Sequence, residues 1–174
     1  MTLAELNALD RNGFVAALGG VFEHSPWVAE AVWPQRPFAT VAALHSAMVE
    51  AVFDAPEDAR LALIRAHPEL AGKAAIRGEL TADSKNEQSG AGLAQCSQEE
   101  FKRLQGLNRA YNEKFGFPFI IAVKGLDRSA IISRFAERVG RDRDLELSEA
   151  LAQIARIARF RLEAMIGNDE GGQR

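Results

Sequence analysis

The residues best suited to acid–base chemistry gather in one short stretch, residues 66–93. This stretch holds a histidine followed by a proline, and then a serine, a glutamate and a glutamine: His67, Pro68, Ser84, Glu87 and Gln88. A histidine has an ordinary pKa of ~6.5, so both of its protonation states are available near neutral pH. A helix that only buries an apolar face does not need such a segment, which therefore predicts a binding or catalytic site.

The position of His67 follows from the proline after it. A residue before proline is disfavoured in α-helical conformation. The helix predicted over residues 56–66 therefore ends at His67, and the ring lies at a helix terminus. A histidine in this position can act as an acid or base. It can equally bond the last carbonyls of the helix. The residues alone leave both interpretations open.

Ser84 and Glu87 match the S-x-x-E pattern of a capping box, which predicts that a helix starts at Ser84. The capping box would explain both residues without any function. Gln88 has no such explanation. The small residues that follow it, 89–92, would let a ligand approach the backbone closely.

Arg161 is the most informative residue outside this stretch. At helical spacing it falls on the same face as an apolar series, namely Leu147, Leu151, Ile154, Ala158 and Met165. Arginine stays charged, so on a buried face it needs an anion. That anion can be a ligand or a structural ion-pair partner, and the side chain can also extend to the edge of the face.

Other chemistries lack a signal. His24 and His45 have no partner at metal-ligand spacing, so we predict no metal site. Cys96 has no histidine beside it in sequence, and a thiol nucleophile is not indicated. The chain has no G-x-G-x-x-G motif, Walker loop or G-x-S-x-G elbow.

The elements that must position these residues are helices. Apolar residues at helical spacing predict a helix from Thr40. A second capping box at Ser97 opens a long helix that Gly116 ends. Further helices are predicted over residues 3–24 with a break near Gly19, from an N-cap at Ser25 to residue 33, from a cap at Asp127 to residue 139, and over 145–166. Residues 117–123 are an apolar connector, extended or helical.

The fold class predicted is all-α, a single-domain bundle of about seven to eight helices over residues 1–166, with no significant sheet. A polar tail, residues 167–174, is expected to be disordered. With 174 residues, 47% of them hydrophobic, the chain is long enough for one well-filled core.

Composition excludes several partners. The net charge of −3 gives no electrostatic reason to expect binding to nucleic acid or to an acidic membrane. No apolar run in the sequence is long enough to cross a bilayer as a helix. A single cysteine fits a reducing compartment, and the C-terminal residues are not a peroxisomal signal, so we expect a cytoplasmic protein.

Several separated motifs together resemble the 2-oxo-4-hydroxy-4-carboxy-5-ureidoimidazoline (OHCU) decarboxylases of urate degradation. They cover nearly the whole chain and occur in the family's order: FEHSPWVAEAVW with RPF, AHPELAG, LTADSKNEQSGAGL, LNRAYNEKFGFPFIIAVKG and RFRLEAMI. The resemblance implies an all-helical homodimer without cofactor that releases CO₂ and forms (S)-allantoin from a substrate that is its own electron sink.

The resemblance also implies roles for individual residues. His67 matches the catalytic histidine and Glu87 the polar loop that binds the substrate, and we predict these two as the catalytic pair, with His67 delivering the proton. The substrate-binding positions matched are Pro68, Ser84, Gln88, Phe119, Ile120, Ile121, Ala122, Val123 and Arg161. We expect His67, Glu87 and Arg161 to converge on one small ring.

Two alternatives remain beside the decarboxylase. The same His/Glu pair could activate water in a ureide or imidazolidine ring hydrolase. A non-enzymatic helical interaction module would instead use His67 and Arg161 as structural polar groups. Turnover and its products distinguish these alternatives.

Overall fold

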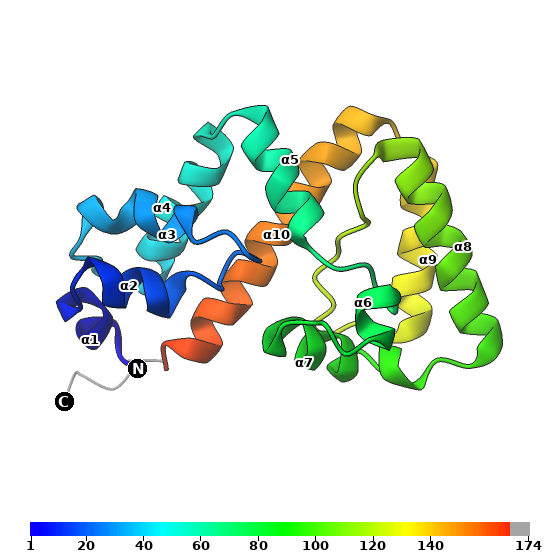
Figure 1. Ribbon diagram of the computed structural model, residues 1–174, viewed down its shortest axis with the longest axis horizontal. Coiled ribbons are helices and arrows are strands. Elements are labelled where there is room, and N and C mark those ends of the chain that lie inside the picture. Colours follow the sequence, from blue (N-terminus) through cyan, green and yellow to red (C-terminus); the bar gives the residue numbers. More distant parts are fainter. Residues whose placement is uncertain (168–174) are drawn as a thin grey trace. The chain divides into compact units, whose positions relative to one another are not determined.

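The computed structural model describes residues 1–167, and these form an all-α fold, as predicted (Figure 1). The described residues contain ten α-helices, two short 3₁₀ helices and no strand. The number of helices exceeds the seven or eight predicted because helices as short as four residues show no apolar period. The disorder predicted for residues 167–174 concerns positions outside the described part of the chain, apart from Gly167.

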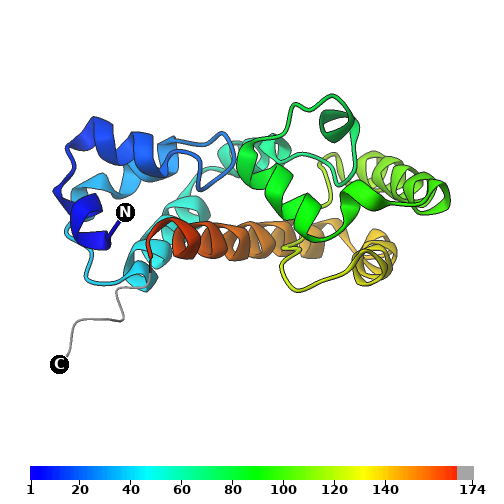
Figure 2. The same ribbon diagram turned by 90° about the horizontal axis from the view of Figure 1, so that it is seen from below.

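The chain divides into two compact units, one formed by residues 1–66 with residues from 155 onward, and one formed by residues 67–154. Helix α10 (Arg143–Met165) is continuous (Figure 2), and its residues belong in part to each unit. The single domain expected over residues 1–166 stays a prediction.

The first unit holds five α-helices and a 3₁₀ helix before the final part of α10: α1 (Leu3–Ala8), α2 (Arg11–Leu18), α3 (Trp27–Val32), η1 (Trp33–Gln35), α4 (Val41–Asp54) and α5 (Glu57–Ala66). The predicted helix over residues 3–24 is two helices, because the Asp10 side chain caps a new start by accepting from Gly13 N at 2.8 Å. The helix predicted from Thr40 is α4, and Thr40 is its N-cap.

The predicted N-cap at Ser25 is wrong. Helix α3 begins after Pro26 without a side-chain cap. The Ser25 hydroxyl donates instead to the Glu23 carbonyl at 2.8 Å. Both residues are buried, and a buried carbonyl needs a donor.

The second unit holds α6 (Lys73–Ile76), α7 (Ala82–Gly90), η2 (Leu93–Gln95), α8 (Gln98–Phe115), α9 (Arg128–Val139) and the first part of α10. The capping box at Ser97 and the glycine stop at Gly116, which has φ 75°, are both as predicted. Asp127 caps α9, also as predicted. Helices α8 and α9 lie side by side (Figure 1).

Between α8 and α9 the chain returns as an extended segment, residues 118–123 (Figure 1). The single tyrosine, Tyr111, sits at the centre of the aromatic packing around it and contacts four rings: Phe115, Phe117, Phe119 and Phe135. The rings of Phe119 and Phe135 stack with centroids 3.9 Å apart. Aromatic packing thus fixes the start of the extended segment against α8 and α9.

A buried ion pair closes this core. Arg138 of α9 donates to both carboxylate oxygens of Glu146, at 2.8 to 3.1 Å, and the Glu146 side chain is fully buried. The Tyr111 hydroxyl donates to the same carboxylate at 2.5 Å. Burial, followed by the hydrogen bond and charge of Glu146, raises the pKa of Tyr111 far above its ordinary value.

Because Tyr111 is the only tyrosine, its ionisation can be followed directly by phenolate absorbance. A raised folded-state pKa means that stability is fully present below the unfolded-state value of ~10 and is lost as pH rises above it. We therefore expect phenolate absorbance to appear together with the loss of helical circular dichroism. A phenolate signal that rises near pH ~10 in the folded protein would contradict a buried, neutral Tyr111.

Candidate active site

His67 lies where the sequence predicts, directly after the last residue of α5, Ala66. Its side chain belongs to the second unit and is buried, with 7% of the residue exposed. Pro68 follows it and fixes one backbone dihedral, so the direction of the chain on either side of the histidine is restricted. A buried imidazole on a restricted backbone is suited to proton transfer in a defined direction.

The capping box predicted at Ser84 is wrong. Helix α7 starts earlier, and its N-cap is Thr81, whose hydroxyl accepts from Ser84 N at 3.2 Å. Threonine is nearly as good a cap as serine, and this earlier start lets Ser84 lie inside the helix. Capping therefore does not account for the Ser84 and Glu87 side chains, and the structural explanation offered by the sequence is removed.

The buried face of α7 is polar. Its buried residues are Ser84 and Gln88, 4% and 7% exposed, and Glu87 beside them is partly buried. Burying hydroxyl and amide groups gives little hydrophobic stabilisation and requires polar partners. A helix with such a face is suited to a polar ligand rather than to an apolar core.

Gln88 connects this helix to the loop after His67. Its Oε1 accepts from Ala71 N at 3.0 Å, and its Nε2 donates to the Glu69 carbonyl at 3.3 Å. Both ends of the carboxamide thus bind the backbone within four residues of His67. The amide still has a second N–H and a second acceptor lone pair.

The extended segment is buried throughout the five positions matched to the substrate pocket, from Phe119 to Val123, none of which is more than 7% exposed. It has no neighbouring strand in the described part of the chain, so side chains satisfy its backbone. Arg138 Nη1 donates to the Ile120 carbonyl at 2.7 Å, and Ala122 N donates to Gln153 Oε1 at 2.9 Å. These two peptide groups of the segment are therefore held in fixed directions.

Arg161 belongs to the first unit and lies on the buried face of α10, as its spacing predicts, with 7% exposed. Its Nη1 pairs with Glu23 Oε2 at 2.7 Å and donates to the Gly20 carbonyl at 3.2 Å. Glu23 is itself 2% exposed. The structural ion pair considered from the sequence is thus present; binding of a substrate by Arg161 stays a prediction, as does its convergence with His67 and Glu87.

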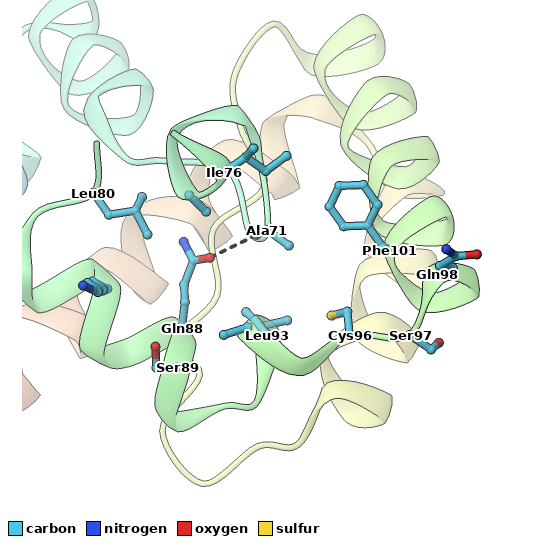
Figure 3. A pocket seen from close by; sticks show the side chains of 13 residues that line it. Ala71, Ile76, Leu80, Gln88, Ser89, Leu93, Cys96, Ser97, Gln98 and Phe101 are labelled. Carbon is cyan, nitrogen blue, oxygen red and sulfur yellow. Dashed lines mark hydrogen bonds between the residues drawn. The ribbon is translucent and has the colours of Figure 1, made fainter. Parts of the chain in front are cut away.

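The second unit contains a cavity of about 450 Å³ beside α7 (Figure 3). Apolar side chains from α6, η2 and α8 line it, among them Ile76, Leu93 and Phe101. Of the predicted site residues, Gln88 alone reaches its wall. Cys96 also lines it, and burial raises the pKa of that thiol, which lowers the fraction of reactive thiolate.

No group of three or more metal-ligating side chains occurs among residues 1–167. Over the same described residues, no helix combines the length and apolar character needed to cross a bilayer.

The sequence of the chain matches the model of a known protein family. The OHCU decarboxylase family model matches residues 7–163. The chain belongs to the OHCU decarboxylase family.

Two relatives and one solved structure show how far the similarity extends. The 2-oxo-4-hydroxy-4-carboxy-5-ureidoimidazoline decarboxylase of Haloferax volcanii is 43% identical over 93% of this chain and 94% of its own length. The enzyme of the same name from Halalkalicoccus jeotgali is 39% identical over 99% of this chain and 96% of its own length. An (S)-allantoin synthase of known crystal structure is 29% identical in sequence. Its fold superposes on this one with a TM-score of 0.78, over 95% of this chain and 54% of that chain.

The residues matched to this family include every predicted site residue, from His67 to Arg161. Sequence reasoning missed the residues that bind the backbone or support the side chains around the predicted site residues, namely Arg138, Glu146, Gln153, Gln105, Asn108 and Asn112. The signal that found Arg161 could have found Arg138, since it follows Ile131 and Phe135 on the buried face of α9. The amides of α8 carry no such signal, because the loop that they bind is distant in sequence.

Proposed function

We propose that this protein decarboxylates 2-oxo-4-hydroxy-4-carboxy-5-ureidoimidazoline to (S)-allantoin and CO₂ during urate degradation. The proposal rests on the membership of residues 7–163 in the OHCU decarboxylase family. The second unit supports it, since a buried histidine precedes a loop that Gln88 ties to the polar face of α7.

The decarboxylation requires the cleavage of one C–C bond and the transfer of protons to and from the substrate. The bond between the carboxylate and the ring carbon bearing the hydroxyl breaks, and its electron pair forms a double bond to the ring carbon bearing the ureido group. The ring C=N accepts the displaced electrons and a proton, giving an enol. Loss of the hydroxyl proton and protonation of the ureido-bearing carbon on one face then give a single enantiomer of allantoin.

Each predicted site residue has a role in this scheme. His67 delivers the proton to carbon. Glu87 orients His67, or accepts a hydrogen bond from the hydroxyl or a ureido N–H of the substrate. Pro68, Ser84 and Gln88 contact the ring and ureido group, and the peptide groups from Phe119 to Val123 line the pocket. Arg161 binds negative charge on the substrate.

A chiral assay tests the proposal. The protein is added to freshly generated product of uricase and hydroxyisourate hydrolase, and optical activity and CO₂ are followed together. We expect an early signal of (S)-allantoin with stoichiometric CO₂, because spontaneous decay gives a racemate. Ammonia or a ring-opened product without CO₂ would favour the hydrolase, and no turnover would favour the interaction module.

The role of Arg161 is tested by Arg161→Lys, which keeps the charge and loses the planar fork. We expect kcat/KM to fall by roughly 10-fold or more, because one ammonium replaces a bidentate donor. Glu23→Gln is the control, since it removes the charge of the ion-pair partner and leaves the Arg161 guanidinium in place. Equal losses of thermal stability in both variants, with undiminished kcat/KM per folded molecule, would show that Arg161 is only structural.

We also propose that the protein acts as a cytoplasmic homodimer, as the family resemblance implies. Light scattering on the purified chain measures its mass, and a monomer at assay concentration would contradict the dimer. Fractionation of the source cells tests the cytoplasmic location.

A further inference from the structure

The loop directly after His67 and Pro68 is bound by an unusual series of side-chain amides. Three consecutive backbone carbonyls each accept a hydrogen bond from a different carboxamide: Glu69 from Gln88 at 3.3 Å, Leu70 from Asn108 at 3.0 Å and Ala71 from Gln105 at 3.0 Å. The Glu69 side chain is bound as well, by Asn112 Nδ2 at 2.6 Å. Residues 69–71 lie outside any helix, so their carbonyls have no helical hydrogen bonds, and the side-chain amides bind them instead.

The three amides from α8 come from one helical face. Gln105, Asn108 and Asn112 are separated by three and four residues, which places them in a row along the helix. Asn108 is 3% exposed, and its Oδ1 has no hydrogen-bond partner in the described part of the chain. Leaving that oxygen unsatisfied carries a desolvation cost. The contact that the Asn108 amide makes is with the loop, through the Leu70 carbonyl, rather than within α8.

The end of the loop is strained, and the amides hold it there. Ala71 has a φ of 48°. This value lies in the left-handed region that residues with a β-carbon rarely adopt. The Ala71 N–H is bound by Gln88 and its carbonyl by Gln105. Strained residues persist where their surroundings over-determine them, and they concentrate at functional sites.

We propose that Gln105, Asn108 and Asn112 are positioning residues for His67, an inference that rests on the proposed function. Only Pro68, with a ring-fixed dihedral, separates His67 from the first bound residue, Glu69. A displacement of the loop is therefore passed to the imidazole. Misplacement of a reacting group by ~1 Å typically costs about 10²-fold in rate, so the amide row sets the direction from which the proton arrives.

The test uses Gln105→Ala and Asn112→Ala, because both residues are only partly buried and the fold should tolerate the truncation. We expect kcat for (S)-allantoin formation to fall about 10- to 100-fold in each variant, with KM changed less than about threefold. Substrate contacts remain, and only the direction of proton delivery changes.

Two controls separate positioning from stability. Glu113→Ala makes the same kind of truncation at an exposed site on α8 and should leave kcat unchanged. Ile131→Val removes one methylene from a fully buried site in α9 and should lower the melting temperature without lowering kcat. If kcat per folded molecule in the amide variants equals that of these controls, the amides only satisfy buried carbonyls and the proposal is overturned.

A second measurement does not depend on catalysis. The ring signals of His67 are assigned by comparison with His67→Asn in an NMR spectrum that contains three histidines. We expect these signals to shift or broaden in the amide variants and to stay in place in both controls. Unchanged His67 signals would overturn the positioning role even if the wild type had no activity, whereas an inactive wild type with shifted signals would count against the proposed function alone.

Discussion

Replacing His67 with asparagine is expected to lower kcat for (S)-allantoin formation by about 10²- to 10⁴-fold, the usual contribution of a positioned general acid. Asparagine retains a polar group at a buried position but does not titrate. The C–C bond can still break in the variant, while the protonation that fixes the handedness loses its donor. The measurement is the initial rate of optical rotation together with the rate of CO₂ release.

The control for this variant is His45→Asn. His45 lies in the first unit, and its Nε2 forms a hydrogen bond with the Ala155 carbonyl at 2.7 Å. The variant therefore loses an imidazole that has no role in the proposed reaction. We expect a small loss of stability and an unchanged kcat. Wild-type kcat and full stereochemical purity in His67→Asn would show that another group delivers the proton.

Local rules predicted much of the fold. Local patterns predicted the helix start at Thr40, the caps at Ser97 and Asp127, and the stops at His67 and Gly116, and all are confirmed. The capping prediction at Ser84 failed for an equally local reason. Thr81 stands three residues earlier and caps α7 instead, because the two patterns compete for one helix start.

The contacts that hold the site could not be predicted in this way. The carbonyls of Leu70 and Ala71 are bound by amides of α8 that lie far along the sequence, and no local pattern records such a pairing. The extended segment was ambiguous for a related reason. Its conformation depends on Arg138 and Gln153, which satisfy its backbone from α9 and α10. Residue types predicted a chemistry, while the directions of these groups come from tertiary contacts.

The largest expected effect on stability is that of Glu146→Gln, which should lower the free energy of unfolding by about 3–5 kcal/mol. The Glu146 side chain is fully buried and faces Arg138, whose side chain is 5% exposed. The amide would leave the guanidinium charge uncompensated in the interior. For a chain of this size, each kcal/mol corresponds to about 2–4 °C in Tm.

Glu137→Gln provides a matched control nearby. Glu137 also pairs with an arginine, Arg141, but its side chain is 67% exposed. Exposed pairs of this kind contribute about 0–1 kcal/mol. A thermal melt of the two variants in the same buffer compares a buried and an exposed carboxylate directly. Equal changes in Tm would contradict a decisive role for the buried pair.

The consequence of Glu146→Gln for the site can be separated from its effect on the fold. Arg138 also holds the Ile120 carbonyl, so an arginine released from Glu146 should loosen the segment predicted to line the pocket. Well-packed apolar residues often replace a buried ion pair without loss of stability. A double variant, Arg138→Met with Glu146→Leu, is therefore expected to regain part of the lost Tm but not the wild-type kcat/KM, since it leaves the Ile120 carbonyl without its donor and the Tyr111 hydroxyl without its acceptor. Recovery of both would mean that the ion pair serves the fold alone.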